Sequence, residues 1–176
     1  MNNKKLGEVF VTSDTHFGDK RLINFTRTNF KTVEEMDQYI IKQWNSVVKK
    51  DDIVIHLGDV IGNKNGDNDS DLKTRWMQVK KLNGKKIIVT GNYDREFNKN
   101  LFYEAGFTDI GSDKFQIDNI IFSHEPIVEL INDFINIHGH IHNGTLCDLI
   151  QTSNRHFNAI GELHNYKPIK IKELLK

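Results

Sequence analysis

Short apolar runs, each rich in β-branched residues, alternate with polar segments along the chain. Five stand out: GEVFVTSD (7–14), DDIVIHLGD (51–59), KKIIVTGN (85–92), NIIFSHE (119–125) and FINIHGHIH (134–142). Continuous apolar runs of this length, bounded by glycine, aspartate and asparagine, are typical of strands that are covered on both faces. The sequence therefore predicts buried β-strands at these five places.

Between the first three predicted strands, apolar residues recur at the spacing of a helix. Thr32 and Glu35 form a capping box, which predicts the start of a helix. Apolar residues then recur at helical spacing: Met36, Ile40, Trp44 and Val47. A second helix is expected from about Asp71 to Leu82, with Gly84 near its end. Alternation of strand, helix and strand predicts an α/β fold.

The last third of the chain has a different pattern. KFQIDNIIF (114–122) is typical of a hairpin that turns at Asp118-Asn119. RHFNAIGELH (155–164) and KPIKIKEL (167–174) are interpreted as further strands, so a mixed sheet is expected. A length of 176 residues fits one domain spanning 1–176.

Composition narrows the class of protein. Lys and Arg together number 24, as do Asp and Glu, so the formal charge is zero, which argues against a protein that coats DNA or a membrane surface. The single cysteine, Cys147, excludes an internal disulfide and suits a reducing compartment. The start, MNNKKLGEVF, has no apolar core of a signal peptide, and no run reaches the roughly 18 apolar residues of a membrane helix. A cytoplasmic protein without a membrane partner is expected.

Candidate functional residues lie at the ends of the five predicted strands. Each delivers an Asp, Asn or His at its carboxyl end: Asp14 and His16, Asp59, Asn92, His124, and His140 with His142. In open α/β sheets these ends converge on one crevice. Alternation in an extended segment would also place Asp14 and His16 on the same side of the strand, and likewise His140 and His142.

Seven such side chains suit a metal centre. They comprise two carboxylates, one amide oxygen and four imidazoles, without a thiolate, a set that favours Mn, Fe, Zn, Ni or Co. Seven ligands exceed one tetrahedral site, and they fit two adjacent cations with a shared carboxylate. Such a pair can hold a bridging hydroxide for in-line attack on a phosphoryl group. Taken singly, Gly58-Asp59 and Gly91-Asn92 are also ordinary turn signals. The order of the motifs, and their common place at strand ends, predicts the metal site.

The series DxH, GD, GN, H and GHxH resembles the calcineurin-like metallophosphoesterase superfamily, in a small single-domain form found in bacteria and phages. The segments DTHFG, RLINFTRTNF, VEEMDQYIIKQWNSVV and FNAIGELHNYKPIKIKEL are similar to that form too. The resemblance implies a metallo-dependent phosphatase-type α/β/β/α sandwich of two mixed sheets flanked by helices. It implies two divalent ions, with Mn the first choice. One would be held by Asp14, His16, Asp59 and His142, and the other by Asp59, Asn92, His124 and His140.

The resemblance makes Asn92, Tyr93 and Asp94 the predicted catalytic residues, but GNYD departs from the family's GNHD or GNHE. The family's histidine serves as general acid, oriented by the following carboxylate. A tyrosine hydroxyl, with a pKa of about 10, is a weaker acid than imidazolium, and general acid catalysis contributes roughly 10²–10⁴-fold. Tyr93 could donate a hydrogen bond directly, stack on a ring of the substrate, or only pack.

Two arginines just beyond DTHFG, Arg21 and Arg27, are predicted to bind the phosphate of the substrate. A solvated helix face is the alternative for both, and Arg95 is a further candidate. Asp19 stands where small relatives often carry histidine. His56 is expected to support the site or pack behind it, without being a ligand.

The predicted function is metal-dependent hydrolysis of phosphate esters, in particular of phosphodiesters in small nucleotide-like substrates. A nuclease or nucleic-acid end phosphatase is the enzymatic alternative; the neutral charge disfavours it, although VKKLNGKK (79–86) leaves room for a basic patch. The non-enzymatic alternative is an interaction scaffold with a decayed metal centre. A scaffold should have lost ligands, and all seven positions are present.

Overall fold

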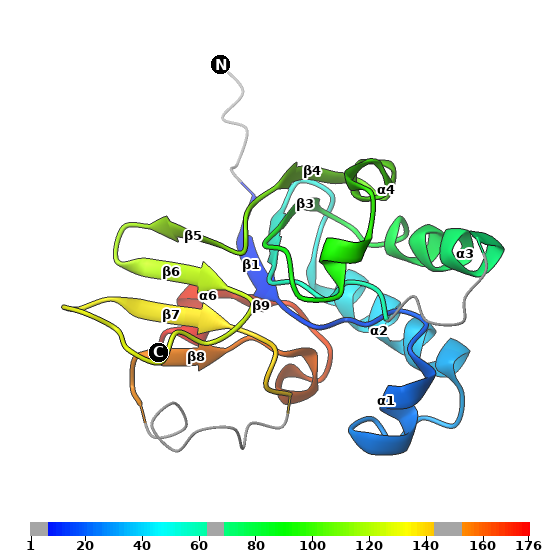
Figure 1. Cartoon of the computed structure of the whole chain (residues 1–176), viewed down its shortest axis with the longest axis horizontal. Coiled ribbons are helices and arrows are strands. Elements are labelled where there is room, and N and C mark those ends of the chain that lie inside the picture. Colours follow the sequence, from blue (N-terminus) through cyan, green and yellow to red (C-terminus); the bar gives the residue numbers. More distant parts are fainter. Residues whose placement is uncertain (1–6, 63–68, 143–152) are drawn as a thin grey trace.

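The computed structural model describes residues 7–62, 69–142 and 153–176. Within them, the first of two β-sheets has the strand order β4-β3-β2-β1-β9 (Figure 1). Its strands are β1 (Val9–Thr12), β2 (Ile53–His56), β3 (Lys85–Ile88), β4 (Phe107–Ile110) and β9 (Ile169–Lys170). The first four are parallel, and β9 runs antiparallel to β1. Because β1, β2 and β3 are parallel neighbours, their carboxyl ends lie at one edge of the sheet.

The second sheet has the order β5-β6-β7-β8. Its strands are β5 (Lys114–Ile117), β6 (Ile120–Ser123), β7 (Ile135–His138) and β8 (His156–Asn158). β5 and β6 form the predicted hairpin, with Ile117 paired to Ile120 and Asp118 at a φ of 52° in the turn. β6, β7 and β8 are parallel. The expected α/β architecture of two mixed sheets flanked by helices is confirmed.

Along the chain, most helices of the described residues connect successive strands of the first sheet. They are α1 (Lys20–Phe25), α2 (Val33–Val47), α3 (Asp69–Val79), α4 (Lys99–Glu104) and α6 (Ile171–Leu174), with the 3₁₀ turns η1 (Asp94–Glu96) and η2 (Gly161–His164). Thr32 caps α2 as predicted, because its hydroxyl accepts a hydrogen bond from the Glu35 N–H at 3.1 Å. None of the described helices is both long and apolar enough to cross a bilayer.

Two predicted strands near the end of the chain are wrong in part. In 155–164, β8 ends at Asn158, whose side-chain oxygen accepts from the Ile160 N–H at 3.1 Å, and the chain then coils into η2. In 167–174, only Ile169–Lys170 pairs with β1, and α6 follows at once. The second predicted helix is shifted, since α3 begins at Asp69 and ends at Val79. Residues 63–68 and Cys147 lie outside the described residues.

Alternating side chains of the central strands feed two separate cores. Phe10 and Val54 point into the first core, where they pack with Trp44 of α2 and Trp76 of α3. Their neighbours point the other way, into a core between the two sheets whose members include Val11, Ile55, Val89, Phe122 and Ile137. The sheet is therefore covered by helices on one face and by β5–β8 on the other (Figure 1). This double burial explains why β1 and β2 show continuous apolar runs.

Candidate metal centre

The predicted ligands lie on turns that follow the strands, not on the strands themselves. β1 ends at Thr12 and β7 at His138, so the ligand pairs are not placed by strand alternation as the sequence suggested. Among the described non-glycine residues with positive φ, five are predicted ligands: Asp14 (53°), His16 (48°), Asp59 (55°), His140 (68°) and His142 (36°). Left-handed backbone is costly for such residues and clusters at functional sites.

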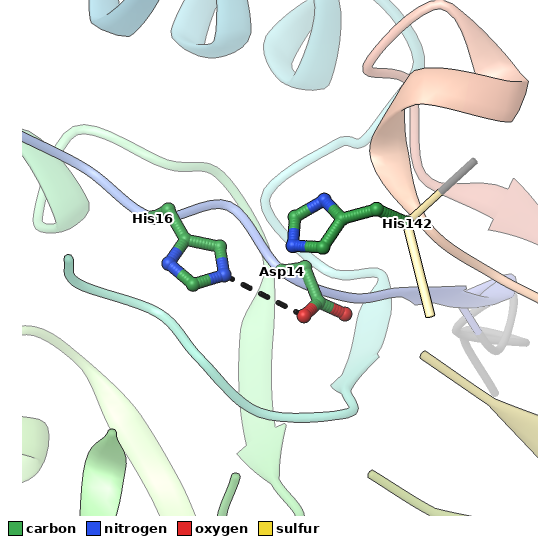
Figure 2. A group of neighbouring side chains, drawn as sticks. All are labelled: Asp14, His16 and His142. Carbon is green, nitrogen blue, oxygen red and sulfur yellow. Dashed lines mark ion pairs between the residues drawn. The ribbon is translucent and has the colours of Figure 1, made fainter. Parts of the chain in front are cut away.

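These turns bring the predicted ligands together. Ligand atoms of Asp14, His16 and His142 lie within 4.8 Å of one another (Figure 2), as do those of Asp14, Asp59 and His124. Asp59 Oδ2 lies 3.6 Å from His16 Nε2 and 3.5 Å from His124 Nε2, between the two groups.

The two remaining ligands adjoin His124. Its Nε2 lies 2.9 Å from Asn92 Oδ1 and 3.1 Å from His140 Nδ1. All seven predicted side chains therefore lie around one small volume.

Several of these polar atoms are buried without a hydrogen-bond partner in the protein. Asp14 Oδ1 and both ring nitrogens of His16 are enclosed and make no hydrogen bond. Buried polar atoms are nearly always satisfied, so such orphans call for a ligand. Nitrogen and oxygen donors in this arrangement fit divalent cations.

Neighbouring groups orient two of the imidazoles. His124 Nδ1 lies 2.7 Å from the Leu57 carbonyl oxygen, to which it donates, so the lone pair of Nε2 faces the centre. His142 Nδ1 lies 2.9 Å from Glu162 Oε1 and is held in the same way. Metal-binding histidines usually carry such a partner on the second nitrogen.

Close packing around the carboxylates requires glycine at two positions. Asp14 Oδ2 accepts hydrogen bonds from the Ser13 hydroxyl and from the His140 N–H, and a Cβ at Gly139 would overlap both Ser13 Oγ and Asp14 Oδ2. A Cβ at Gly91 would overlap Asp59 Oδ1. The glycines of the GN and GHxH motifs thus let the backbone approach the ligands.

The charges of the centre compete with one another. Burial, with the nearby carboxylates of Asp14 and Asp94, raises the pKa of Asp59 to about 8. Burial also acts to raise the pKa of Asp14, but the nearby imidazoles of His16 and His124 and the Ser13 hydroxyl outweigh it and hold that pKa below its usual range. Burial lowers the pKa of His16. Divalent cations favour ionised carboxylates and neutral imidazoles, so their charge would resolve this competition.

Tyr93 and Asp94 contact the centre through hydrogen bonds that join a carboxylate to backbone N–H groups. The Tyr93 N–H donates to Asp59 Oδ1 at 3.0 Å, and its ring meets the His16 ring edge-on, with centroids 5.4 Å apart. Asp94 is buried. Its Oδ2 accepts from the N–H groups of Asp59 (2.6 Å) and Gly91 (2.8 Å), and its Oδ1 from that of Val60 (3.1 Å). Asp94 therefore ties the Asp59 loop to the Gly91-Asn92 loop.

The two predicted phosphate-binding arginines lie in different environments. Arg21 is about half exposed, and its guanidinium forms two hydrogen bonds to Asp19, at 2.9 and 2.5 Å. Arg27 is fully buried and donates to the carbonyls of Asp14 (2.5 Å) and Thr15 (2.8 Å). The enclosure of Arg27 does not fit the predicted contact with substrate, because no face of its guanidinium is open. Its place is instead behind the DTHFG turn, which it holds together.

Two positioning residues carry little signal in the sequence. Glu162 Oε1 accepts from both His142 Nδ1 and Arg27 Nε, each at 2.9 Å. Burial acts to raise the pKa of Glu162, but these two partners outweigh it and bring the pKa to about 2. Asp19 Oδ2 lies 3.7 Å from His16 Nδ1. The glutamate in GELH could have been suspected from its place in an otherwise apolar stretch.

Two further candidates lie beside the centre. His56 is buried behind it, with Nε2 3.0 Å from the Thr15 hydroxyl and its ring stacked on Trp44, as expected for a supporting residue. Arg95 lies exposed on η1.

A cavity of about 330 Å³ opens onto the centre. Its floor and walls are formed by His16, Asp19, Arg21, Leu22, Phe25, Asp59, Asn92, Tyr93, His140 and His142. Five of the seven predicted ligands therefore face a space large enough for a small molecule.

Comparison with known proteins identifies the family of the chain. A protein of Methanocaldococcus jannaschii is 33% identical over 172 residues, which cover 96% of this chain and 90% of that protein. The Gene 66 protein of Mycobacterium phage L5 is 36% identical over 90 residues, or 51% of this chain and 41% of that protein. The Calcineurin-like phosphoesterase family matches residues 7–175.

Solved structures show the same fold. A protein of unknown function from Aquifex aeolicus superimposes with a TM-score of 0.70 at 26% identity, covering 95% of this chain and 97% of that one. The nuclease MPE of Pseudomonas putida has a TM-score of 0.53 at 17% identity, with 76% of this chain and 60% of that one covered, a likeness of fold alone. The chain belongs to the calcineurin-like phosphoesterase family, hydrolases of phosphate esters that generally depend on two metal ions.

Proposed function

We propose that the protein hydrolyses phosphodiesters in small nucleotide-like substrates, with two divalent cations, Mn²⁺ by preference, at the centre. The main observation in support is that Asp59 Oδ2 lies within 3.6 Å of both His16 Nε2 and His124 Nε2. Asp59 also lines the cavity. Bound cations would polarise a phosphoryl oxygen and lower the pKa of a water molecule.

The seven ligands divide naturally into two sets. Asp14, His16, Asp59 and His142 would hold one cation, and Asp59, Asn92, His124 and His140 the other. The first cluster of close ligand atoms, Asp14 with His16 and His142, falls within the first set. The second brings the shared Asp59 together with His124 of the second set, and Asp14 is also close. An interaction scaffold would not need to retain these orphaned buried donors.

The surrounding residues bind and orient the ester. Arg21 is held by two hydrogen bonds from its guanidinium to Asp19 and faces the cavity, which suits it to contact a phosphate oxygen. Asp94 fixes the loops that carry Asp59 and Asn92.

Of the three interpretations of Tyr93, its contacts favour packing and positioning. Its ring lies against His16, and the Arg21 guanidinium carbon lies 5.3 Å from the ring centre. Because tyrosine replaces the histidine that serves the family as general acid, esters whose leaving groups have a low pKa are expected to react best.

A nuclease is the competing activity. The structural neighbour from Pseudomonas putida is a nuclease, but its likeness to this chain supports the fold alone. Among the described residues that line the cavity, Arg21 is the one arginine and no lysine is present. Nucleic-acid grooves are rich in both, so the lining favours small esters.

The proposal is tested with purified protein reconstituted with Mn²⁺ and with an apo control. Its substrates are bis(p-nitrophenyl) phosphate, p-nitrophenyl phosphate, cyclic nucleotides, dinucleotides and single-stranded DNA. Metal-dependent turnover of the small diesters above the monoester and the DNA is expected, with loss of activity in Asp59→Asn. Turnover of DNA above all small diesters would favour the nuclease, and equal activity in Asp59→Asn would overturn the proposed centre.

A further inference from the structure

One wall of the cavity carries an exposed aromatic ring that the metal centre does not use. Phe25, in the last turn of α1, is 77% exposed, the highest value among the large hydrophobic residues described as exposed. It also lines the cavity. An apolar ring left in water beside a catalytic centre forgoes the stabilisation of burial, and such surfaces commonly mark a binding contact.

The neighbours of Phe25 on α1 extend this surface. Arg21 and Leu22 precede Phe25 by four and three residues, so the three side chains share one face of the helix, and all three line the cavity. Arg21 is fixed by Asp19 and its guanidinium lies over the Tyr93 ring, 5.3 Å from the ring centre. The α1 wall, defined as Arg21, Leu22 and Phe25, thus offers flat apolar and cationic surface next to the metal ligands.

The chemistry of this wall selects for a planar ring. Phenyl and guanidinium groups both stack on aromatic faces, and they do so without reading the hydrogen-bonding edge of a base. A volume of about 330 Å³ is small for a ligand site and suits one nucleotide unit. A phosphate held at the centre would place an attached base within reach of the α1 wall.

We propose that the α1 wall is a subsite for the aromatic ring of the substrate, so that the protein prefers phosphate esters that carry a nucleobase or a similar planar group. This inference rests on the proposed function for the position of the phosphate. It adds the residues that recognise the rest of the molecule, and it assigns Phe25 as the main contact. Because stacking is tolerant, adenine and uracil should be accepted almost equally.

The test compares two ligands that share the ribose 5-phosphate group, one with a base and one with a hydroxyl group in its place. AMP and ribose 5-phosphate are titrated calorimetrically into the Mn²⁺-loaded protein, a measurement that needs no turnover. AMP is expected to bind about 5- to 150-fold more tightly than ribose 5-phosphate, the range for one stacked base. Phe25→Ala should reduce this ratio to about twofold or less, and Phe25→Trp should restore it.

Ile131→Ala is the matched control, since Ile131 is 70% exposed and is not part of the cavity lining. It should keep the wild-type ratio. Equal binding of the two ligands by the wild type, or an AMP preference that survives in Phe25→Ala, would overturn the subsite. Hydrolysis of diesters, assayed separately, would still stand in that case; absent hydrolysis with an intact AMP preference would instead refute the proposed function.

Discussion

Replacing Glu162 with glutamine is expected to weaken the fold and one half of the metal centre together. Glu162 Oε1 receives hydrogen bonds from Arg27 Nε and His142 Nδ1, each at 2.9 Å, and the Arg27 side chain is completely enclosed. Glutamine keeps the shape and one acceptor oxygen but removes the charge, so the buried guanidinium loses the carboxylate that it contacts directly.

The magnitude follows from the burial. Removing one partner of a buried ion pair costs about 3–5 kcal/mol. The retained acceptor places Glu162→Gln near the lower end of that range. For a chain of this length, about 3 kcal/mol corresponds to a fall in melting temperature of roughly 6–12 °C. Loss of the carboxylate behind His142 should also lower the affinity for one of the two cations by roughly 10–100-fold.

Two assays separate these effects. Scanning calorimetry of the metal-free protein measures the melting temperature, and isothermal titration with Mn²⁺ measures two affinities, of which one should fall. Glu96→Gln is the control, because Glu96 is an exposed carboxylate on η1. If Glu162→Gln melts within about 2 °C of the wild type and binds Mn²⁺ unchanged, the reasoning about the buried pair is refuted.

Three further substitutions test other contacts. Tyr93→His should speed esters with alkoxide leaving groups by about 10-fold or more while p-nitrophenyl esters change little; an equal change in kcat/KM for both would contradict the acid argument. Asp94→Asn should lower Mn²⁺ affinity about 10-fold by titration, because one amide oxygen cannot replace a carboxylate that accepts from three N–H groups; unchanged affinity would refute its positioning role. Burial raises the pKa of Asp37 to about 7, so the native state binds more protons between about pH 4 and 7 and loses stability as pH rises. Asp37→Asn should therefore be more stable than the wild type in urea unfolding at pH 8 but not at pH 4, whereas the same difference at both would contradict this.

Most of the central sheet could be predicted from the sequence because its strands are buried on both faces. Phe10 and Val11 enter different cores, so β1 shows as an unbroken apolar run. The tail of the chain was harder to predict. In 167–174 the alternation of Ile and Lys imitates a longer strand, but only two residues pair with β1 before α6 begins. Which residues pair is decided by tertiary contacts that no local pattern contains.

The seven side chains that meet at the candidate centre could be predicted from strand-end motifs, but their geometry could not. The left-handed backbone at Asp14, Asp59 and His140 lies in tightly packed turns. Adjacent glycines, Gly58 and Gly139, hint at such turns for Asp59 and His140, but no glycine adjoins Asp14. Arg27 and Glu162 are 135 positions apart, and their contact has no local sequence signature. Arg27 also does not lie on an exposed helix face, which was the alternative expected from the sequence. Helix α1 ends at Phe25, and Arg27 lies beyond it with its side chain buried.

Anomalous X-ray diffraction from Mn²⁺-soaked crystals, measured at the manganese edge, tests the central claim most directly. The account predicts two peaks roughly 3.5–4 Å apart, both within bonding distance of the Asp59 carboxylate. One set of protein ligands should be Asp14, His16 and His142, and the other Asn92, His124 and His140. A single peak, or manganese bound away from Asp59, would contradict a shared two-metal centre.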